Sequence, residues 1–218
     1  MSVADKQPRL LILPVVLATV AVIVATAVSL EASDIALVRW VDDGDTVVLA
    51  DGRRVRYAGI NTPEVAHKDK PAERLGPEAR DFNRRLVFGK KVRLEFDREK
   101  YDQYGRLLAY VFLLDGTFVN GALVREGYAY FFFHPPNKKY ERQLLGLQRQ
   151  AMDNKAGMWK GFSGRQGPLI GNRRSRRFHR ATCPFGKAIS PQNRIDFRTE
   201  CDAFRAGFSP CKKCSGIQ

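Results

Sequence analysis

Residues 46–64 read TVVLADGRRVRYAGINTPE, and this stretch gives the clearest indication of the fold. Residues 46–50 and 53–60 contain several residues that favour β-strands, and the Asp51-Gly52 pair between them is typical of a tight hairpin turn. The stretch therefore predicts two antiparallel strands. Its last four residues, NTPE, turn polar at a Thr-Pro step, which raises the question of whether they only end a strand or also hold a ligand.

Short strands and helices are expected on both sides of this hairpin. Alternating or β-rich segments predict further strands at residues 36–40, 91–96 and 107–114. Helical spacing of apolar residues predicts helices at 77–88, 119–126 and within 137–154. The chain is thus expected to be α+β and predominantly β: a five-stranded antiparallel barrel of the OB-fold type with three helices packed outside.

The charge of the chain is strongly positive. Among 218 residues, 37 Lys and Arg stand against 23 Asp and Glu, for a net charge of +14. Such an excess favours a polyanionic partner, either nucleic acid or an anionic membrane surface, over a protein with evenly solvated lysines. Placement supports this, since residues 160–180 contain no acidic residue and the following basic ones: Lys160, Arg165, Arg173, Arg174, Arg176, Arg177 and Arg180.

The N-terminal segment carries a separate signal. Residues 10–30 contain no charged residue, and Lys6 and Arg9 precede them. An uncharged span of this length is long enough to cross a membrane as a helix, and the preceding positive charges place its N-terminus inside. We expect a membrane anchor with the folded part on the extracytoplasmic side. Residues 25–27 (ATA) resemble a cleavage site, so secretion after cleavage stays open.

Composition divides the rest of the chain. The segment 161–171 is rich in glycine, and all four cysteines follow it. We expect four parts: a signal anchor or transmembrane segment at 1–32, the barrel domain at 33–160, a basic Gly-rich linker at 161–177, and a small module at 178–218.

Three polar segments of the barrel region complement one another chemically. They are VDDGDT at 41–46, NTPE at 61–64 and YDQYGR at 101–106. Alone, each reads as a solvated turn. Together they offer oxygen ligands suited to Ca²⁺, a carboxylate able to activate water, and arginines able to neutralise charge on a phosphate. These are the groups that hydrolysis of a phosphodiester requires.

Five ordered segments carry a family resemblance: VDDGDTVVL, VRYAGINTPE, LGPEARDF, FDREKYDQYGRLLAYVF and VNGALVREGYA. In this order they resemble staphylococcal nuclease-like (thermonuclease) domains, over residues 36–159. The resemblance implies an OB-fold endonuclease that depends on Ca²⁺ and cleaves DNA and RNA to 3′-phosphate ends. It implies that Arg56 and Arg106 grip the reacting phosphate and that Glu64 activates the water. Tyr104 matches a tyrosine that approaches another phosphate of the nucleotide.

The same resemblance implies a metal site. Asp45 matches a ligating aspartate, Thr62 the residue that offers its main-chain carbonyl, and Asp43 an acidic residue beside them. Asn61 stands where the family usually has a second carboxylate ligand. An amide oxygen is an ordinary ligand for Ca²⁺ but brings no charge, so the resemblance implies a weaker metal site here. The additional carboxylate of Asp42 is expected to compensate in part.

The segment YAYFFFHPPN, residues 128–137, also departs from the family pattern. The aromatic rings at 130–133 are of the kind that stack on the bases of single strands. Alternation along a terminal strand would bury some of them, so we expect at least half of these rings to belong to the core.

The C-terminal module predicts a second metal site. His179 and Cys183 are four residues apart, and Cys211 and Cys214 form a C-x-x-C pair, which fits tetrahedral Zn²⁺. Cys201 remains as a fifth candidate. Two disulfides in an exported chain, or a redox-active Cys211–Cys214 dithiol, are the alternatives.

The segments FHRxxC, NRIxF and AGFxPCKxC resemble the zinc-binding module of the Ada DNA-repair protein. In that module four cysteines hold zinc, and the first accepts a methyl group from DNA. His179 stands at that first position here, and imidazole is a poor acceptor for this reaction. The resemblance therefore implies a structural zinc site that assists nucleic-acid binding.

The leading interpretation is an active nuclease, membrane-anchored or exported, acting as a monomer on single-stranded DNA or RNA. The rival is a catalytically silent barrel at the membrane that only binds nucleic acid or a protein. The presence of Arg56, Glu64 and Arg106 favours the enzyme. In addition, the basic segment 160–180 is suited to an anionic lipid surface.

Overall fold

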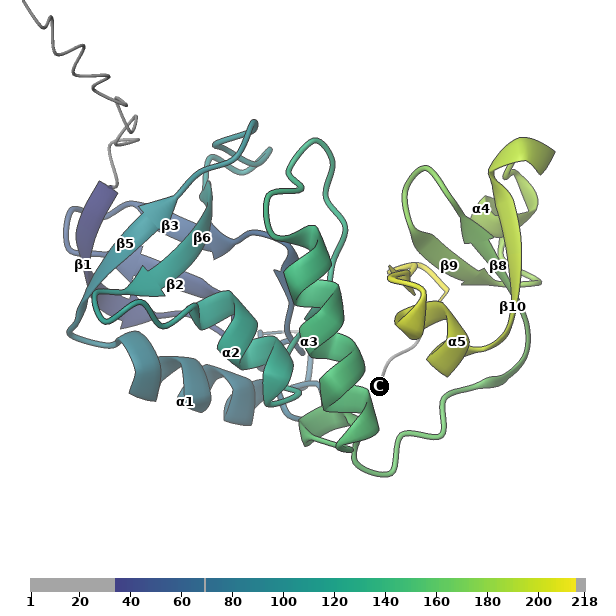
Figure 1. Cartoon of the computed structure of the whole chain (residues 1–218), viewed down its shortest axis with the longest axis horizontal. Helices are drawn as coiled ribbons and strands as arrows, with labels where there is room; N and C mark the ends of the chain where they lie inside the picture. The colour runs from purple at the N-terminus through teal and green to yellow at the C-terminus, as the bar shows by residue number, and fades with distance from the viewer. Residues whose placement is uncertain (1–33, 69, 215–218) are drawn as a thin grey trace, which may run out of the picture. The chain divides into compact units, whose positions relative to one another are not determined.

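A computed structural model describes residues 34–68 and 70–214. Its first part is a closed barrel with the strand order β1-β2-β3-β6-β5 (Figure 1). The strands are β1 (Asp34–Val41), β2 (Thr46–Leu49), β3 (Arg54–Tyr57), β5 (Lys91–Glu95) and β6 (Leu107–Leu113). This confirms the predicted five-stranded barrel. One pairing differs from the expected antiparallel arrangement, because β3 and β6 run parallel, with Val55 opposite Leu107.

The barrel interior is filled by apolar side chains from all five strands. In β2 and β3, Val47, Leu49 and Val55 are fully buried. Every residue of β6 is buried, since one face of this strand points into the barrel and the other is covered by helices. The buried Asn120 accepts a hydrogen bond from Val111 N at 2.9 Å and donates one to Ala58 O at 2.9 Å. These bonds tie β6 to the end of β3.

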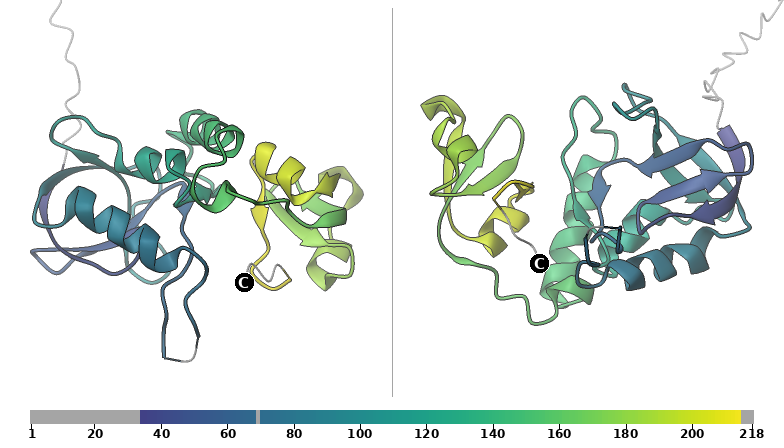
Figure 2. Two further views of the ribbon diagram at one scale, coloured as in Figure 1. Left: turned by 90° about the horizontal axis from the view of Figure 1, so that it is seen from below. Right: turned by 180° about the vertical axis from the view of Figure 1, so that it is seen from behind.

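Three helices pack outside the barrel, as predicted: α1 (Gly76–Val87), α2 (Val119–Arg125) and α3 (Glu141–Asp153). Helix α2 contacts β6, α3 and α1, and α1 also contacts β1. Figure 2 shows the three helices against the barrel from two further sides. Two very short strands, β4 (Ile60–Asn61) and β7 (Tyr130–Phe131), form a separate sheet that brings Asn61 opposite Tyr130. This small sheet carries part of the candidate active site.

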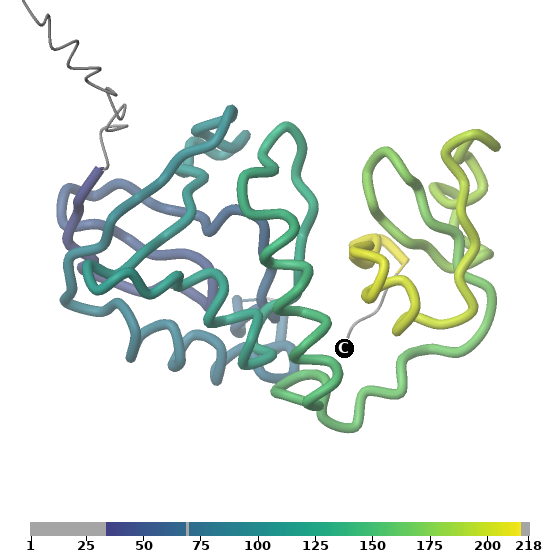
Figure 3. Tube along the Cα trace, in the orientation of Figure 1, coloured from purple at the N-terminus to yellow at the C-terminus, as the bar shows by residue number. Residues whose placement is uncertain are grey.

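The C-terminal module is a four-stranded sheet in the order β10-β8-β9-β11. Its strands are β8 (Gln166–Asn172), β9 (Arg177–Arg180), β10 (Arg194–Thr199) and β11 (Ser209–Pro210), with helices α4 (Pro184–Lys187) and α5 (Glu200–Arg205). Short 3₁₀ helices span Gly157–Trp159 and Pro191–Asn193. Figure 3 traces the chain from α3 into this sheet.

Strand β8 lies within the segment expected to be a linker. Leu169 and Ile170 are buried in the sheet. Gly171 supports close packing, because a Cβ atom there would lie 2.7 Å from a ring carbon of Phe197. Gly171 therefore allows β8 and β10 to pack closely. Because β8 begins at Gln166, the segment that connects the barrel domain to the sheet is residues 161–165, shorter than the expected linker.

The module packs on α3 within the same compact unit as the barrel. Ala151 of α3 shares an apolar cluster with Trp159, Phe178 and Phe204. Gln148, fully buried on α3, accepts from Phe131 N at 2.6 Å and donates to Phe204 O at 2.6 Å. One side chain thus bonds the barrel region to α5.

No helix in the described part of the chain is long and apolar enough to cross a membrane. The predicted span at residues 10–30 lies outside the described residues.

Candidate active site and candidate metal centre

The ends of β3 and β4 and the turn before β2 meet at one corner of the barrel. Within that turn, Asp43 accepts a hydrogen bond from Asp45 N at 2.9 Å, which shapes the tight bend. A Cβ atom at Gly44 would lie 2.7 Å from the Thr62 side chain. The absence of a side chain at Gly44 therefore lets the acidic turn approach the Thr-Pro step.

Arg56 joins the expected metal ligands. Its Nη1 lies 2.8 Å from Asp45 Oδ2, and its Nη2 donates to Asn61 Oδ1 at 2.8 Å. Asp45 Oδ2 also accepts from Thr62 N at 2.8 Å. Asp45, Asn61 and Thr62 are all buried. The structure thus brings the three predicted ligands together, with two of their side-chain oxygens directed at one positive charge.

The Asn61 amide has a second set of contacts. Its Nδ2 donates to the Thr62 carbonyl oxygen at 3.0 Å and to the Tyr130 hydroxyl oxygen at 3.0 Å. The carbonyl expected to bind a cation is therefore bonded to the Asn61 amide nitrogen. All candidate donors at this corner are oxygens, which fits Ca²⁺. For Asn61 to offer its oxygen beside the Thr62 carbonyl, its amide would have to turn over.

Burial dominates the electrostatics of Asp45. It raises the pKa of this carboxyl to about 7, while the Arg56 guanidinium opposes the rise and the Asp43 carboxylate adds to it. A buried carboxylate with a second acidic neighbour gains from any additional positive charge beside it. The site is accordingly suited to a cation.

Two adjoining clefts open beside this corner. One, of about 540 Å³, is lined by Arg56, Arg106 and Tyr104. The other, of about 500 Å³, is lined by the exposed Glu64. Asn61 lines both. The structure therefore places the two predicted phosphate-binding arginines in one cleft and the predicted base in its neighbour.

Arg106 and Glu64 each form hydrogen bonds with a neighbouring acidic residue. Arg106 Nε donates to Asp102 Oδ2 at 2.8 Å, and its Nη2 lies 2.7 Å from the same oxygen. The Arg106 guanidinium carbon is 5.5 Å from the centroid of the Tyr104 ring, which is 75 % exposed. Glu64 is held through its main chain, since Glu64 N donates to Glu73 Oε2 at 3.0 Å. Glu64 O in turn accepts from Glu73 N at 2.9 Å, so both main-chain polar groups of Glu64 are hydrogen-bonded to Glu73.

Asp102, Glu73 and the Tyr130 hydroxyl are supporting groups that sequence reasoning missed. The D-x-x-x-R spacing of Asp102 and Arg106 could have indicated the first contact. Glu73 lies nine residues beyond Glu64 with no such pattern, and Tyr130 lies 69 residues beyond Asn61. Asp42, expected to compensate for the missing charge at Asn61, instead pairs with Arg54 at 2.6 Å.

The aromatic segment divides as its alternation predicts. Phe131 and Phe133 are buried, while Tyr130 and Phe132 are partly exposed. The Arg177 guanidinium carbon lies 3.7 Å from the centroid of the Phe132 ring. Half of this segment therefore belongs to the core, and the remaining rings contact polar groups of the site and of the C-terminal module.

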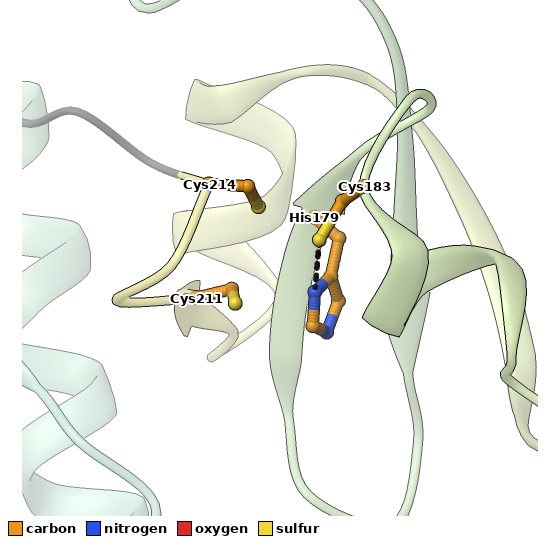
Figure 4. Close-up of side chains that lie close together, drawn as sticks. All are labelled: His179, Cys183, Cys211 and Cys214. Atoms are coloured by element: carbon orange, nitrogen blue, oxygen red, sulfur yellow. Dashed lines mark hydrogen bonds between the residues drawn. The ribbon is translucent and has the colours of Figure 1, made fainter.

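The predicted sulfur and nitrogen ligands form a compact cluster in the module (Figure 4). His179 comes from β9, Cys183 precedes α4, and Cys211 and Cys214 follow β11. One donor atom from each residue lies within 4.8 Å of the others, and His179 Nδ1 is 3.6 Å from Cys183 Sγ. Around tetrahedral Zn²⁺, with bonds of about 2.3 Å to sulfur, ligand atoms are separated by about 3.8 Å. The donor set and its spacing fit zinc.

Other features of the module agree with a metal site. None of the four cysteines, all in the described part of the chain, forms a disulfide. Burial, assisted by the Arg177 charge, lowers the pKa of His179 and so favours the neutral imidazole that binds metals. Cys201 stands apart from the cluster, and its Sγ donates to Ser163 O at 3.6 Å.

The closed barrel, the two arginines in one cleft and the carboxylate in the adjoining cleft indicate a class of protein suited to binding phosphodiesters. Residues 54–161 match the family model described as staphylococcal nuclease homologue. The thermonuclease of Staphylococcus intermedius is 41% identical over 127 residues, covering 57% of this chain and 75% of the relative. The thermonuclease of Staphylococcus hyicus is 41% identical over 120 residues, covering 54% and 70% respectively.

The endonuclease YncB of Bacillus subtilis is 36% identical over 135 residues, covering 56% of this chain and 64% of that protein. The chain therefore belongs to the staphylococcal nuclease family and is a hydrolase of the nuclease type. The family match ends at residue 161, before the sheet that holds the Cys/His cluster.

Proposed function

We propose that the chain is a Ca²⁺-dependent phosphodiesterase that hydrolyses strands of DNA, RNA or both to 3′-phosphate products. The observation that carries this proposal is the shared cleft of Arg56 and Arg106, which adjoins the cleft of Glu64 at Asn61. A phosphate held by the two arginines would lie close to both a carboxylate base and a set of oxygen ligands. The thermonuclease relatives support the same reaction.

Arg56 and Arg106 have the role of binding the phosphate and stabilising the charge that builds on its equatorial oxygens. Asp102 positions Arg106 by accepting two of its N–H groups. Glu64 takes the proton of the attacking water. A water-derived P–O bond forms, the P–O5′ bond breaks, and the leaving oxygen takes up a proton to become a 5′-hydroxyl, which leaves the phosphate on the 3′ side.

The metal ligands would be Asp45 Oδ, the Thr62 carbonyl and the Asn61 amide oxygen, with Asp43 beside them. A bound Ca²⁺ would supply positive charge to a phosphate oxygen. Because Asn61 contributes no charge and its amide nitrogen bonds to Thr62 O, this site should bind Ca²⁺ more weakly than one with a carboxylate at position 61.

For the module, we propose one structural Zn²⁺ held by His179, Cys183, Cys211 and Cys214. The convergence of their donor atoms within 4.8 Å supports this role. Zinc binding would stabilise a unit too small to fold on apolar burial alone. Two disulfides remain the competing outcome, to be decided by metal content.

The location and partners follow from the N-terminal segment and the net charge. We propose that residues 10–30 anchor the chain with its catalytic domain on the extracytoplasmic side, or that the domain is secreted after cleavage. The net charge of +14 supports nucleic acid as substrate and an anionic membrane surface as neighbour. We propose a monomer as the active form.

The test is cleavage of a 5′-labelled single-stranded DNA by the full chain with millimolar Ca²⁺, compared with chelator. Cleavage only with Ca²⁺, yielding ends that a 3′-phosphatase modifies, is the expected result. Tight binding of the DNA without any cleavage would instead establish the silent nucleic-acid-binding barrel.

A further inference from the structure

The turn between the last two cysteines of the module reaches the candidate active site. Of the residues that the structure describes, two line both clefts: Asn61, from the barrel, and Lys212, from the sequence Cys211-Lys212-Lys213-Cys214. Lys212 is exposed. A cationic side chain of the C-terminal module therefore borders the same space as Arg56, Arg106 and Glu64.

The position of this turn is fixed within the module. Strand β11 pairs with β9 in parallel, and Cys211 N donates to Phe178 O at 2.9 Å. Cys214 N donates to Cys211 O at 3.2 Å, which closes the turn on either side of Lys212 and Lys213. Both ends of the turn belong to the Cys/His cluster. A metal bound there would restrain Lys212 from both sides.

The module is in turn held on the barrel domain by polar contacts at separate points. Gln148 donates to Phe204 O at 2.6 Å, Arg177 Nη2 donates to Phe133 O at 3.0 Å, and Arg176 Nη1 lies 2.7 Å from Glu141 Oε1. Arg177 also donates to Ser209 Oγ at 2.6 Å, directly before the turn. These contacts set the place of the turn relative to the clefts.

Basic side chains outnumber acidic ones by one in the lining of each cleft, four to three and three to two, which favours a polyanionic backbone. Lys212 adds a positive charge to the cleft of Arg56 and Arg106, and it also borders the second cleft with Lys70, Arg74 and Arg165. A strand whose scissile phosphate is held by the two arginines would pass from one cleft toward the other beside Asn61, which lines both. Lys212, the one described residue of the module that lines both clefts, lies where they adjoin.

We propose that Lys212 binds a backbone phosphate next to the scissile one, so that the C-terminal module completes the substrate cleft of the nuclease. The inference rests on the proposed nuclease function. Lys213 provides a matched control, because it is the same residue type, is exposed, and is absent from the lining of both clefts.

The experiment measures binding without cleavage. A full chain carrying Glu64→Gln is mixed with 5′-fluorescein oligothymidylate and Ca²⁺, and anisotropy gives Kd over a series of KCl concentrations. Adding Lys212→Ala should raise Kd about tenfold and lower the slope of log Kd against log salt by about 0.7, as expected for one lost phosphate contact on a single strand. Lys212→Arg should restore both values, and Lys213→Ala should change Kd by no more than about twofold.

Equal values for Lys212→Ala and Lys213→Ala would overturn the inference and leave the nuclease proposal standing. Failure of the Glu64→Gln chain to bind the oligonucleotide at all would overturn both. Retention of tight binding and an unchanged salt slope in Lys212→Ala would show that the turn borders the cleft without contacting the substrate.

Discussion

The two candidate metal sites of this chain differ in their ligands and in their surroundings. At the barrel, Asp45, Asn61 and Thr62 offer oxygens, and Arg56 bonds to the first two side chains. In the module, three cysteines and His179 offer sulfur and nitrogen within 4.8 Å of one another. Asn61 lines both clefts, whereas none of the four cluster residues lines either. We therefore propose a catalytic role for the oxygen site and a structural role for the sulfur site.

Loss of the sulfur site should have the largest effect on stability. Cys211→Ser should abolish zinc binding and unfold the module, because structural zinc contributes on the order of 10 kcal/mol to units of this size. Metal analysis and thermal unfolding of the purified chain would measure this. Cys201→Ser is the control and should keep about one zinc per chain, since Cys201 lies outside the cluster. Two disulfides and no metal in the unmodified chain would contradict the assignment.

Loss of the proposed catalytic groups should lower the rate of cleavage and leave the zinc content of the chain unchanged. Glu64→Gln and Arg106→Ala should each lower kcat by about a thousandfold, because one removes the base and the other a partner of the transition-state charge. Single-turnover cleavage and circular dichroism would separate activity from folding. Glu78→Gln, on the exposed part of α1, should retain full activity. Near-full activity in either active-site variant would refute its assigned role.

The contact between α3 of the barrel domain and the C-terminal module should contribute to the stability of the chain. Gln148→Ala removes two buried hydrogen bonds, leaving Phe131 N and Phe204 O without this partner. The expected loss is about 2 kcal/mol in the free energy of unfolding. Urea titration would measure it, with Gln143→Ala on the exposed side of α3 as a control that should change little. An unchanged unfolding midpoint would mean that the module does not pack against α3 in solution.

The smallest expected effect concerns the missing charge at the oxygen site. Asn61→Asp should tighten Ca²⁺ binding about tenfold, because a carboxylate adds charge and cannot donate to the Thr62 carbonyl. Calorimetric titration would measure the change. Asn154→Asp adds the same charge at the exposed end of α3 and should leave the affinity as it is. An unchanged affinity in Asn61→Asp would remove Asn61 from the ligands.

The two regions also differ in how far the sequence predicts them. The hairpin of β2 and β3 is predicted by β-forming residues on both sides of Asp51-Gly52, and the family pattern points to Arg56, Glu64 and Arg106. Strand β8 was not predicted, because its glycines are typical of a linker. Only the structure shows that Gly171 makes room for the Phe197 ring. The Tyr130 contact with Asn61 and the place of Lys212 depend on tertiary packing between distant segments, which local pattern does not encode.

The most direct test separates the two metals in one preparation. The full chain is purified in Ca²⁺-free buffer without chelator, its zinc content is measured, and cleavage of single-stranded DNA is followed before and after addition of Ca²⁺. The division of roles predicts about one zinc per chain throughout, no cleavage before the addition, and prompt cleavage after it. Full activity of the zinc-loaded chain without Ca²⁺ would contradict it.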